Sequence, residues 1–322
     1  MSEYSSLEKI KSIARLIRLP NLLILVLLQT LLRYSILEPF LYQGDPSAMS
    51  HWYDFLLQIA ATLLLAAGGY VINDYFDIKI DAINRPGKLV VDRLISPRGA
   101  IKLHILLNIL AIIVGFYLAY RVRSFAVAMI FPIISGLLWF YSARYKRMVI
   151  WGNLVVSIFA SLVILLTWVG EFMWLRLDPV MFITVTPELS FVLKLFLGYG
   201  LFAFLVSLFR EIIKDMEDFE GDKSIGCRTL PIAAGINTTR WIVAGLVILT
   251  IGLLAYSQVW MMLRQWYLMF WYFMFVVQLP ALYLLFQLFN AKKKEDFHFL
   301  SSLCKLIMFA GILSMELLSI SV

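Results

Sequence analysis

The sequence predicts an all-α membrane protein with nine transmembrane helices, and three observations support this fold class. Of the 322 residues, 61% are hydrophobic and only 15% are charged. A soluble domain is nearer half apolar and a quarter charged, so the composition is that of a membrane protein. The other two observations are a series of long apolar segments and an uneven distribution of lysine and arginine between the loops.

The apolar segments define the predicted spans. A helix needs about 20 mostly apolar residues to cross the hydrocarbon core of a bilayer. Nine segments meet this requirement, at residues 20–40, 54–76, 100–120, 124–143, 150–170, 190–212, 238–260, 265–290 and 298–319. Residues 1–19 are charged and amphipathic, so they are expected to form a helix at the membrane interface. The chain is expected to be a single polytopic domain over 1–322.

The basic residues predict the orientation of the chain. If the N-terminus is cytoplasmic, the inner segments hold 21 of the 28 Lys and Arg residues and the outer loops hold four. This bias predicts a cytoplasmic N-terminus and, with nine spans, an external C-terminus. The net charge of +7 is therefore mostly a topology signal. No basic stripe is interleaved with stacking aromatics, so no nucleic-acid partner is expected. Cys227 and Cys304 lack metal-ligand spacing.

Two groups of three aspartates interrupt the apolar pattern, each following a predicted span. They are Asp74, Asp77 and Asp81 after the second span, and Asp215, Asp218 and Asp222 after the sixth. Both groups have the spacing i, i+3, i+7, which places three carboxylates on one face of a helix. Asp215 follows Asp74 by 141 residues, so the spacing also indicates an internal repeat.

The free energy of placing aspartates at these positions is unfavourable, which indicates that they have a cationic partner. An aspartate at the centre of a lipid-embedded helix is disfavoured by about 2.5–3.5 kcal/mol, and a helix C-terminus also disfavours anions. Carboxylates without nearby His or Cys favour Mg²⁺, whose other ligands are often substrate phosphates. One such run would usually be a solvated loop end, but two in the same register favour a site for Mg²⁺ and a diphosphate. Glu217 and Glu220 lie on other helical faces and are interpreted as solvated acids.

The strings NDYFDIKID (73–81) and DMEDFEGD (215–222) resemble the two aspartate-rich motifs of the UbiA-type intramembrane prenyltransferase superfamily. The resemblance covers nearly the whole chain, and the longer string REIIKDMEDFEGD resembles the branch that makes archaeal-type ether lipids. It implies a helical bundle around a central cavity, with cytoplasmic helical cap loops at 77–99 and 215–237. It also implies Mg²⁺, two ions in all, held by both motifs together with an allylic diphosphate.

The resemblance assigns individual residues. The metal ligands are Asn73, Asp74, Asp77, Asp81, Asp215, Asp218 and Asp222, and the six aspartates are also the catalytic residues. The residues that bind substrate or diphosphate are Asn21, Asn73, Lys88, Arg93, Tyr141, Lys146, Arg210 and Lys214. Lys88 and Arg93 stand where many members have a second Arg-Pro. Tyr145 competes with Tyr141, because the gap before Lys146 differs from that of the members with aromatic substrates.

The implied function is that of an enzyme, a membrane prenyltransferase. It would transfer a prenyl group, geranylgeranyl for this branch, from its diphosphate to the hydroxyl of geranylgeranylglyceryl phosphate. Arg18, Lys88, Arg93 or Lys146 would hold the acceptor phosphate. An aromatic quinone precursor is the alternative acceptor, and a cation transporter is the alternative class. The expected partners are the isoprenoid diphosphate, a lipid-like or aromatic acceptor and membrane lipids. The active site is expected to face the cytoplasm, and the three histidines are interpreted as structural.

Overall fold

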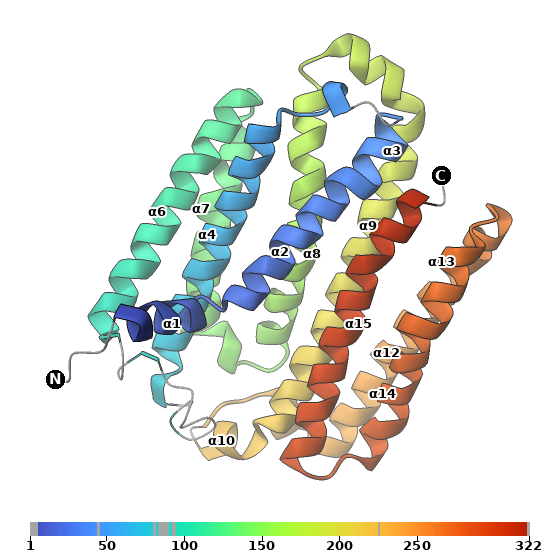
Figure 1. The fold of residues 1–322 in the computed structure, drawn as a ribbon. Helices are drawn as coiled ribbons and strands as arrows, with labels where there is room; N and C mark the ends of the chain where they lie inside the picture. The colour runs from blue at the N-terminus through green and yellow to red at the C-terminus, as the bar shows by residue number, and fades with distance from the viewer. Residues whose placement is uncertain are drawn as a thin grey trace. The chain divides into compact units, whose positions relative to one another are not determined.

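The computed structural model describes residues 6–43, 46–79, 82, 90–91, 95–224 and 226–320 (Figure 1). Every extended element within these residues is a helix, and an isolated β-bridge joins Val91 to Ile95. The predicted all-α fold class is therefore confirmed.

Nine helical segments among the described residues are long and apolar enough to cross a membrane. They are Leu19–Leu41, Trp52–Phe76 (α4), Pro97–Arg121 (α6), Phe125–Ala143 (α7), Trp151–Leu175 (α8), Pro179–Glu217 (α9), Ile236–Leu263 (α12), Tyr267–Asn290 and Lys294–Ile320 (α15). Each corresponds to one of the nine spans predicted from the sequence, with differences at the ends.

The first and eighth spans each contain a π-helical turn. The first consists of α2 (Leu19–Leu31), η1 (Leu32–Leu37) and α3 (Glu38–Leu41), and the eighth of α13 (Tyr267–Tyr272), η4 (Phe273–Gln278) and α14 (Leu279–Asn290). In both spans a proline, Pro39 or Pro280, stands two residues after the π-turn. A proline has no N–H and its ring clashes with the preceding turn, so a locally wider helix accommodates it.

Short helices precede the first span or lie between later spans. They are α1 (Ser6–Leu16), η2 (Pro46–Ala48), η3 (Tyr145–Arg147), α10 (Phe219–Ser224) and α11 (Leu230–Ala234). The predicted N-terminal helix is therefore present as α1, and its place at the membrane interface remains a prediction. The expected cap at 215–237 contains α10 and α11, whereas much of the one at 77–99 lies outside the described residues.

The chain divides into two compact units. The first comprises Met1–Gln29, Ser50–Lys146 and Val169–Pro179, and the second comprises Thr30–Met49, Arg147–Trp168 and Val180–Val322. Within the first unit, α4, α6 and α7 pack against one another (Figure 1). Within the second unit, α14 packs against α12 and α15. The first acidic motif belongs to the first unit and the second motif to the second. The single domain over 1–322 remains a prediction.

Helix α9 extends beyond the predicted span at both ends. It begins at Pro179 rather than near residue 190, and the helix continues through Pro187. Thr, Glu and Pro in the segment 184–188 favour a break when only the sequence is considered. With 39 residues, α9 is roughly 58 Å long, nearly twice the thickness of the hydrocarbon core. Because it ends at Glu217, Asp215 lies on the helix itself rather than in a following loop.

Close packing in the first unit depends on a glycine. Gly115 of α6 lies against the buried ring of Phe131 of α7, and a Cβ added at Gly115 would lie 2.2 Å from Cδ2 of that ring. Small residues at helix contacts let the backbones approach closely, which is a common source of stability between membrane helices.

We expect Gly115→Ala to destabilise the protein by about 1–3 kcal/mol, because the new methyl group must displace a packed ring. Thermal unfolding of the purified protein in detergent would measure the change. Gly136→Ala on α7 is the matched control, since no atom lies within 4 Å of its added Cβ. Equal unfolding temperatures for the two variants would contradict the packing account.

Candidate functional site

The first acidic motif lies at the C-terminal end of α4. Asp77 caps this helix, and its backbone N–H donates to the carbonyl of Asn73 at 3.0 Å. The Asn73 side chain forms a second hydrogen bond with Asp77, in which Nδ2 donates to Oδ2 at 2.7 Å. Asp77 is buried. The four-residue spacing on a helical turn therefore holds the asparagine and the aspartate together.

A lysine contacts both residues of this pair. Lys146, in η3, donates from Nζ to Asn73 Oδ1 at 3.3 Å and forms an ion pair with Asp77. The sequence analysis assigned Lys146 to the site, and the structure places it against the first motif. Two oxygen acceptors, from Asn73 and Asp77, thus converge on one positive charge.

An arginine pairs with Asp74, the first acid of the motif. Arg18 Nη2 donates to Asp74 Oδ1 at 3.1 Å, and the guanidinium lies 4.7 Å from the ring centroid of Tyr70. Burial acts to lower the pKa of Arg18 and Asp74 acts to raise it; the net direction is upward, so Arg18 is a cation. Arg18 has a positive φ of 53°, a conformation that is uncommon for a residue other than glycine.

Two of the residues predicted to bind substrate, Asn21 and Tyr141, interact with Tyr70 or Arg18. Asn21 Nδ2 donates to the hydroxyl of Tyr70 at 3.4 Å. Tyr141 acts electrostatically to raise the pKa of Arg18. Tyr145 lies in η3 beside Lys146. The sequence analysis missed Tyr70, although it precedes Asp74 by one helical turn and therefore shares its face.

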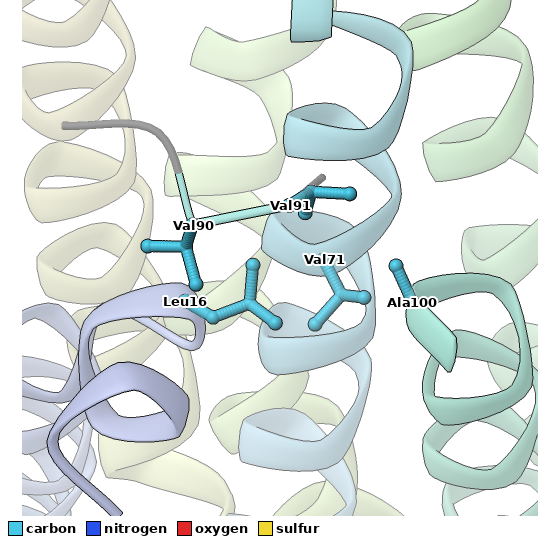
Figure 2. Close-up of a cluster of buried hydrophobic side chains, with 5 residues drawn as sticks. All are labelled: Leu16, Val71, Val90, Val91 and Ala100. Atoms are coloured by element: carbon cyan, nitrogen blue, oxygen red, sulfur yellow. The ribbon is translucent and has the colours of Figure 1, made fainter. Parts of the chain in front are cut away.

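A buried apolar cluster supports this motif. It consists of Leu16, Val71, Val90, Val91 and Ala100, all at most 3% exposed. Figure 2 shows the five side chains converging from α1, α4, the start of α6 and the segment that precedes it. Val71 stands two residues before Asn73, and Leu16 two residues before Arg18. The cluster therefore fixes backbone on both sides of the Arg18–Asp74 contact.

Three predicted site residues of the first unit lie outside the described part of the chain. They are Asp81, Lys88 and Arg93. Their assignments to metal and diphosphate remain predictions.

The second motif follows a nearly continuous helical path through the end of α9 and into α10. The N–H of Asp218 donates to Lys214 O at 2.9 Å, and that of Asp222 donates to Asp218 O at 3.0 Å. These are α-helical hydrogen bonds, so the i, i+3, i+7 spacing keeps the three aspartates on one side. Asn153 of α8 donates from Nδ2 to Asp215 Oδ2 at 2.8 Å. The sequence analysis did not identify Asn153.

The two predicted cations of this motif share a glutamate. Arg210 forms an ion pair with Glu211, and Lys214 Nζ lies 3.3 Å from Glu211 Oε2. Glu211 was not predicted as a site residue. Its position one helical turn before Asp215 could have indicated it, because residues four apart share a helical face.

Helix α15 contacts one motif aspartate, Asp218, and the residue before it, Glu217. Lys294 Nζ lies 3.9 Å from Asp218 Oδ1, and His298 Nδ1 lies 2.9 Å from Glu217 Oε1. Glu217 is 9% exposed, so its interpretation as a solvated acid was wrong. Glu220 is exposed, as expected. The sequence indicates that Glu217 points away from the aspartates, but it does not indicate that another helix covers that face.

The donor atoms of both motifs suit a hard cation. Asn and Asp oxygens are the ligands that Mg²⁺ prefers, and Mg²⁺ usually takes one or two carboxylates beside water and phosphate oxygens. Among the described residues, no three His, Cys, Asp or Glu side chains gather closely enough to hold a metal ion by themselves. A site completed by substrate phosphates agrees with both observations.

This fold and these motifs define a class of membrane proteins. Residues 44–303 match the UbiA prenyltransferase family, and the chain belongs to that family. With nine apolar helices among the residues that the structure describes, it is an integral multi-pass membrane protein.

The sequence is also similar to those of individual proteins with a more specific name than the family's. The chain is similar to digeranylgeranylglyceryl phosphate synthase of Methanothermobacter thermautotrophicus, with 33% identity over 199 residues. That match covers 61% of this chain and 62% of the relative, a little less than two thirds of its length.

Solved structures share the fold. One, reported for digeranylgeranylglyceryl phosphate synthase in membranes, has a TM-score of 0.63 and 24% identity, covering 98% of this chain and 100% of the other. A UbiA homolog from Archaeoglobus fulgidus, bound to GPP and Mg²⁺, has a TM-score of 0.54 and 17% identity, covering 94% of this chain and 99% of that one.

We expect Leu16→Ala to destabilise the first unit by about 2–5 kcal/mol, because Leu16 is fully buried in the cluster that supports the first motif. Hydrogen exchange should accelerate at the amides of 95–100, which adjoin the cluster. Ile13→Ala on the same helix is the control, since Ile13 is 46% exposed. Unchanged exchange in Leu16→Ala would show that the cluster does not hold this segment.

Proposed function

We propose that this protein transfers a geranylgeranyl group from its diphosphate to the hydroxyl of geranylgeranylglyceryl phosphate and releases diphosphate. The observation that carries the proposal is the pairing of carboxylates with cations, and in one case with an amide donor, at the ends of α4 and α9. Lys146 contacts Asp77 in the first unit, and Lys294 and Asn153 contact Asp218 and Asp215 in the second. We propose that both motifs serve one bound diphosphate.

The acids have the role of metal ligands. Asn73, Asp74, Asp77 and Asp81 would hold one Mg²⁺, and Asp215, Asp218 and Asp222 a second. When bound, the ions neutralise the negative charge of the diphosphate and stabilise it as a leaving group. The convergence of Asn73 and Asp77 oxygens on the Lys146 ammonium supports this assignment, because the same atoms suit a metal cation. The A. fulgidus homolog, solved with Mg²⁺ and GPP, supports it as well.

The basic residues bind the diphosphate. Negative charge grows on the leaving oxygens as the bond from the allylic carbon to the bridging oxygen breaks. Lys146, Arg210 and Lys214 would donate to these oxygens, together with Lys88 and Arg93. Removing one such donor typically costs about 3 kcal/mol in the barrier. In the second unit Glu211 orients Arg210 and Lys214, because it contacts both cations.

The acceptor hydroxyl completes the transfer. Its oxygen bonds to the allylic carbon and its proton is lost to solvent or to the released diphosphate. Arg18 is the described cation best suited to hold the acceptor phosphate, because its side chain is 41% exposed while Asp74 and Tyr70 fix its direction. Asn21 and Tyr141 would bind substrate beside it. The name of the M. thermautotrophicus relative supports a glycerol phosphate acceptor rather than an aromatic one.

The proposed orientation places the chemistry at the cytoplasmic side. Both motifs follow predicted spans at segments rich in Lys and Arg, and such segments remain cytoplasmic. The N-terminus would then be cytoplasmic and the C-terminus external. Water-soluble diphosphate released from the site would return to the cytoplasm.

We expect the purified chain to convert geranylgeranyl diphosphate and geranylgeranylglyceryl phosphate into a doubly prenylated product, and EDTA to abolish the reaction. Asp77→Asn should lower kcat/KM by about 100-fold, because it weakens a metal ligand. Mass spectrometry of the lipid extract would measure the product.

Asp178→Asn is the matched control, because this exposed aspartate precedes α9 at the end opposite to the motif. It should retain wild-type activity. Transfer that persists in EDTA, or product formed only with 4-hydroxybenzoate or a dihydroxynaphthoate, would overturn the proposal.

A further inference from the structure

We propose that α15 positions the second acidic motif by holding Glu217, which lies between Asp215 and Asp218 in the sequence. Glu217, His298 and Ser301 would then be positioning residues for metal and diphosphate binding. This inference rests on the proposed function of the motif, and it assigns a role to three residues outside it.

The contacts are specific on both helices. His298 Nδ1 lies 2.9 Å from Glu217 Oε1, and the hydroxyl of Ser301 donates to Glu217 Oε2 at 3.4 Å. Both oxygens of one carboxylate therefore have partners on α15. A third residue of the same helix, Lys294, lies 3.9 Å from Asp218. Lys294, His298 and Ser301 have the spacing i, i+4, i+7, so they form one stripe along α15.

Helical geometry gives this contact a direction. Successive residues of an α-helix are about 100° apart, which places Glu217 roughly 160° from Asp215 around the axis. Glu217 therefore lies on the side of α9 opposite to Asp215, and α15 contacts both Glu217 and, through Lys294, the following residue Asp218. A helix that is held on one side cannot rotate about its axis, so the contact with α15 determines where the aspartates point.

Packing alone does not require an acid at this position. Burial of a carboxylate is costly unless it is hydrogen-bonded or paired, and an apolar residue would fill the same space without that cost. Glu217 is 9% exposed and its partners are polar. Directional hydrogen bonds fix orientation more sharply than apolar contact does, which is what a metal ligand nearby requires.

The test measures metal binding as well as activity. Mn²⁺ binding to the full-length chain in detergent would be followed by electron paramagnetic resonance in the presence of inorganic pyrophosphate. Alongside it, the Mg²⁺ activation constant and the KM for geranylgeranyl diphosphate would be measured. The variants are Glu217→Ala, His298→Ala and His298→Gln. Glu220→Ala is the matched control, because it removes the same charge from an exposed position in the same string.

We expect Glu217→Ala and His298→Ala to weaken Mn²⁺ binding and to raise the Mg²⁺ activation constant by about ten-fold or more, as for other outer partners of metal ligands. His298→Gln keeps a donor and should recover most of the affinity. The His298 side chain is 62% exposed, so its truncation leaves the fold intact even if Glu217→Ala does not fold. Glu220→Ala should match the wild type.

Wild-type Mn²⁺ affinity in both His298→Ala and Glu217→Ala would overturn the inference, even if either variant unfolded at a lower temperature. Absence of Mn²⁺–pyrophosphate binding in the wild-type chain would instead contradict the proposed function. The two failures are therefore distinguishable.

Discussion

The structure depends on how carboxylates are stabilised at the ends of apolar helices. Asp77 and Glu217 are buried beside membrane-spanning segments, where the helix C-terminus disfavours anions and burial removes water. Each carboxylate has a polar partner. Lys146 forms an ion pair with Asp77, and a ring nitrogen of His298 lies 2.9 Å from an oxygen of Glu217. Removing Lys146 would leave the buried charge of Asp77 without its ion-pair partner, which typically costs about 3–5 kcal/mol, whereas Glu217 would keep its contact with Ser301 after loss of His298. The segments that supply these partners, η3 and the start of α15, are therefore coupled to the helices that carry the acids.

The need to stabilise these buried carboxylates links the stability of the fold to the proposed function. Carboxylates that already attract cations suit a divalent ion, and cations that already contact carboxylates suit a diphosphate. In the proposed function, a bound metal–diphosphate complex would exchange ion pairs with these residues and would not bring bare charges into an apolar medium. Carboxylates and cations lie in contact in both motifs, and this arrangement suits a reaction that releases an anionic leaving group.

The sequence predicts the parts of this account that depend on local patterns. Nine apolar segments gave the nine spans, and the i, i+3, i+7 spacing identified the aspartates before any coordinates. Lys146 was predicted only through a family resemblance, and the structure places it against Asp77. Contacts between distant segments had no local signal. Examples are Asn153 with Asp215, the Leu16 cluster and the burial of Glu217 against α15. The early start of α9 was missed because Pro187 normally ends a helix in water, whereas neighbouring groups tolerate it in a membrane helix.

We propose that both acidic motifs bind one diphosphate. An experimental structure of the full chain with Mn²⁺ and geranylgeranyl thiodiphosphate would test it most directly, because anomalous scattering locates Mn²⁺ without ambiguity. The account predicts one Mn²⁺ beside Asp74 and Asp77, a second beside Asp215 and Asp218, and a single diphosphate that contacts both ions. Ions at one motif alone, or motifs too far apart to share one diphosphate, would contradict it.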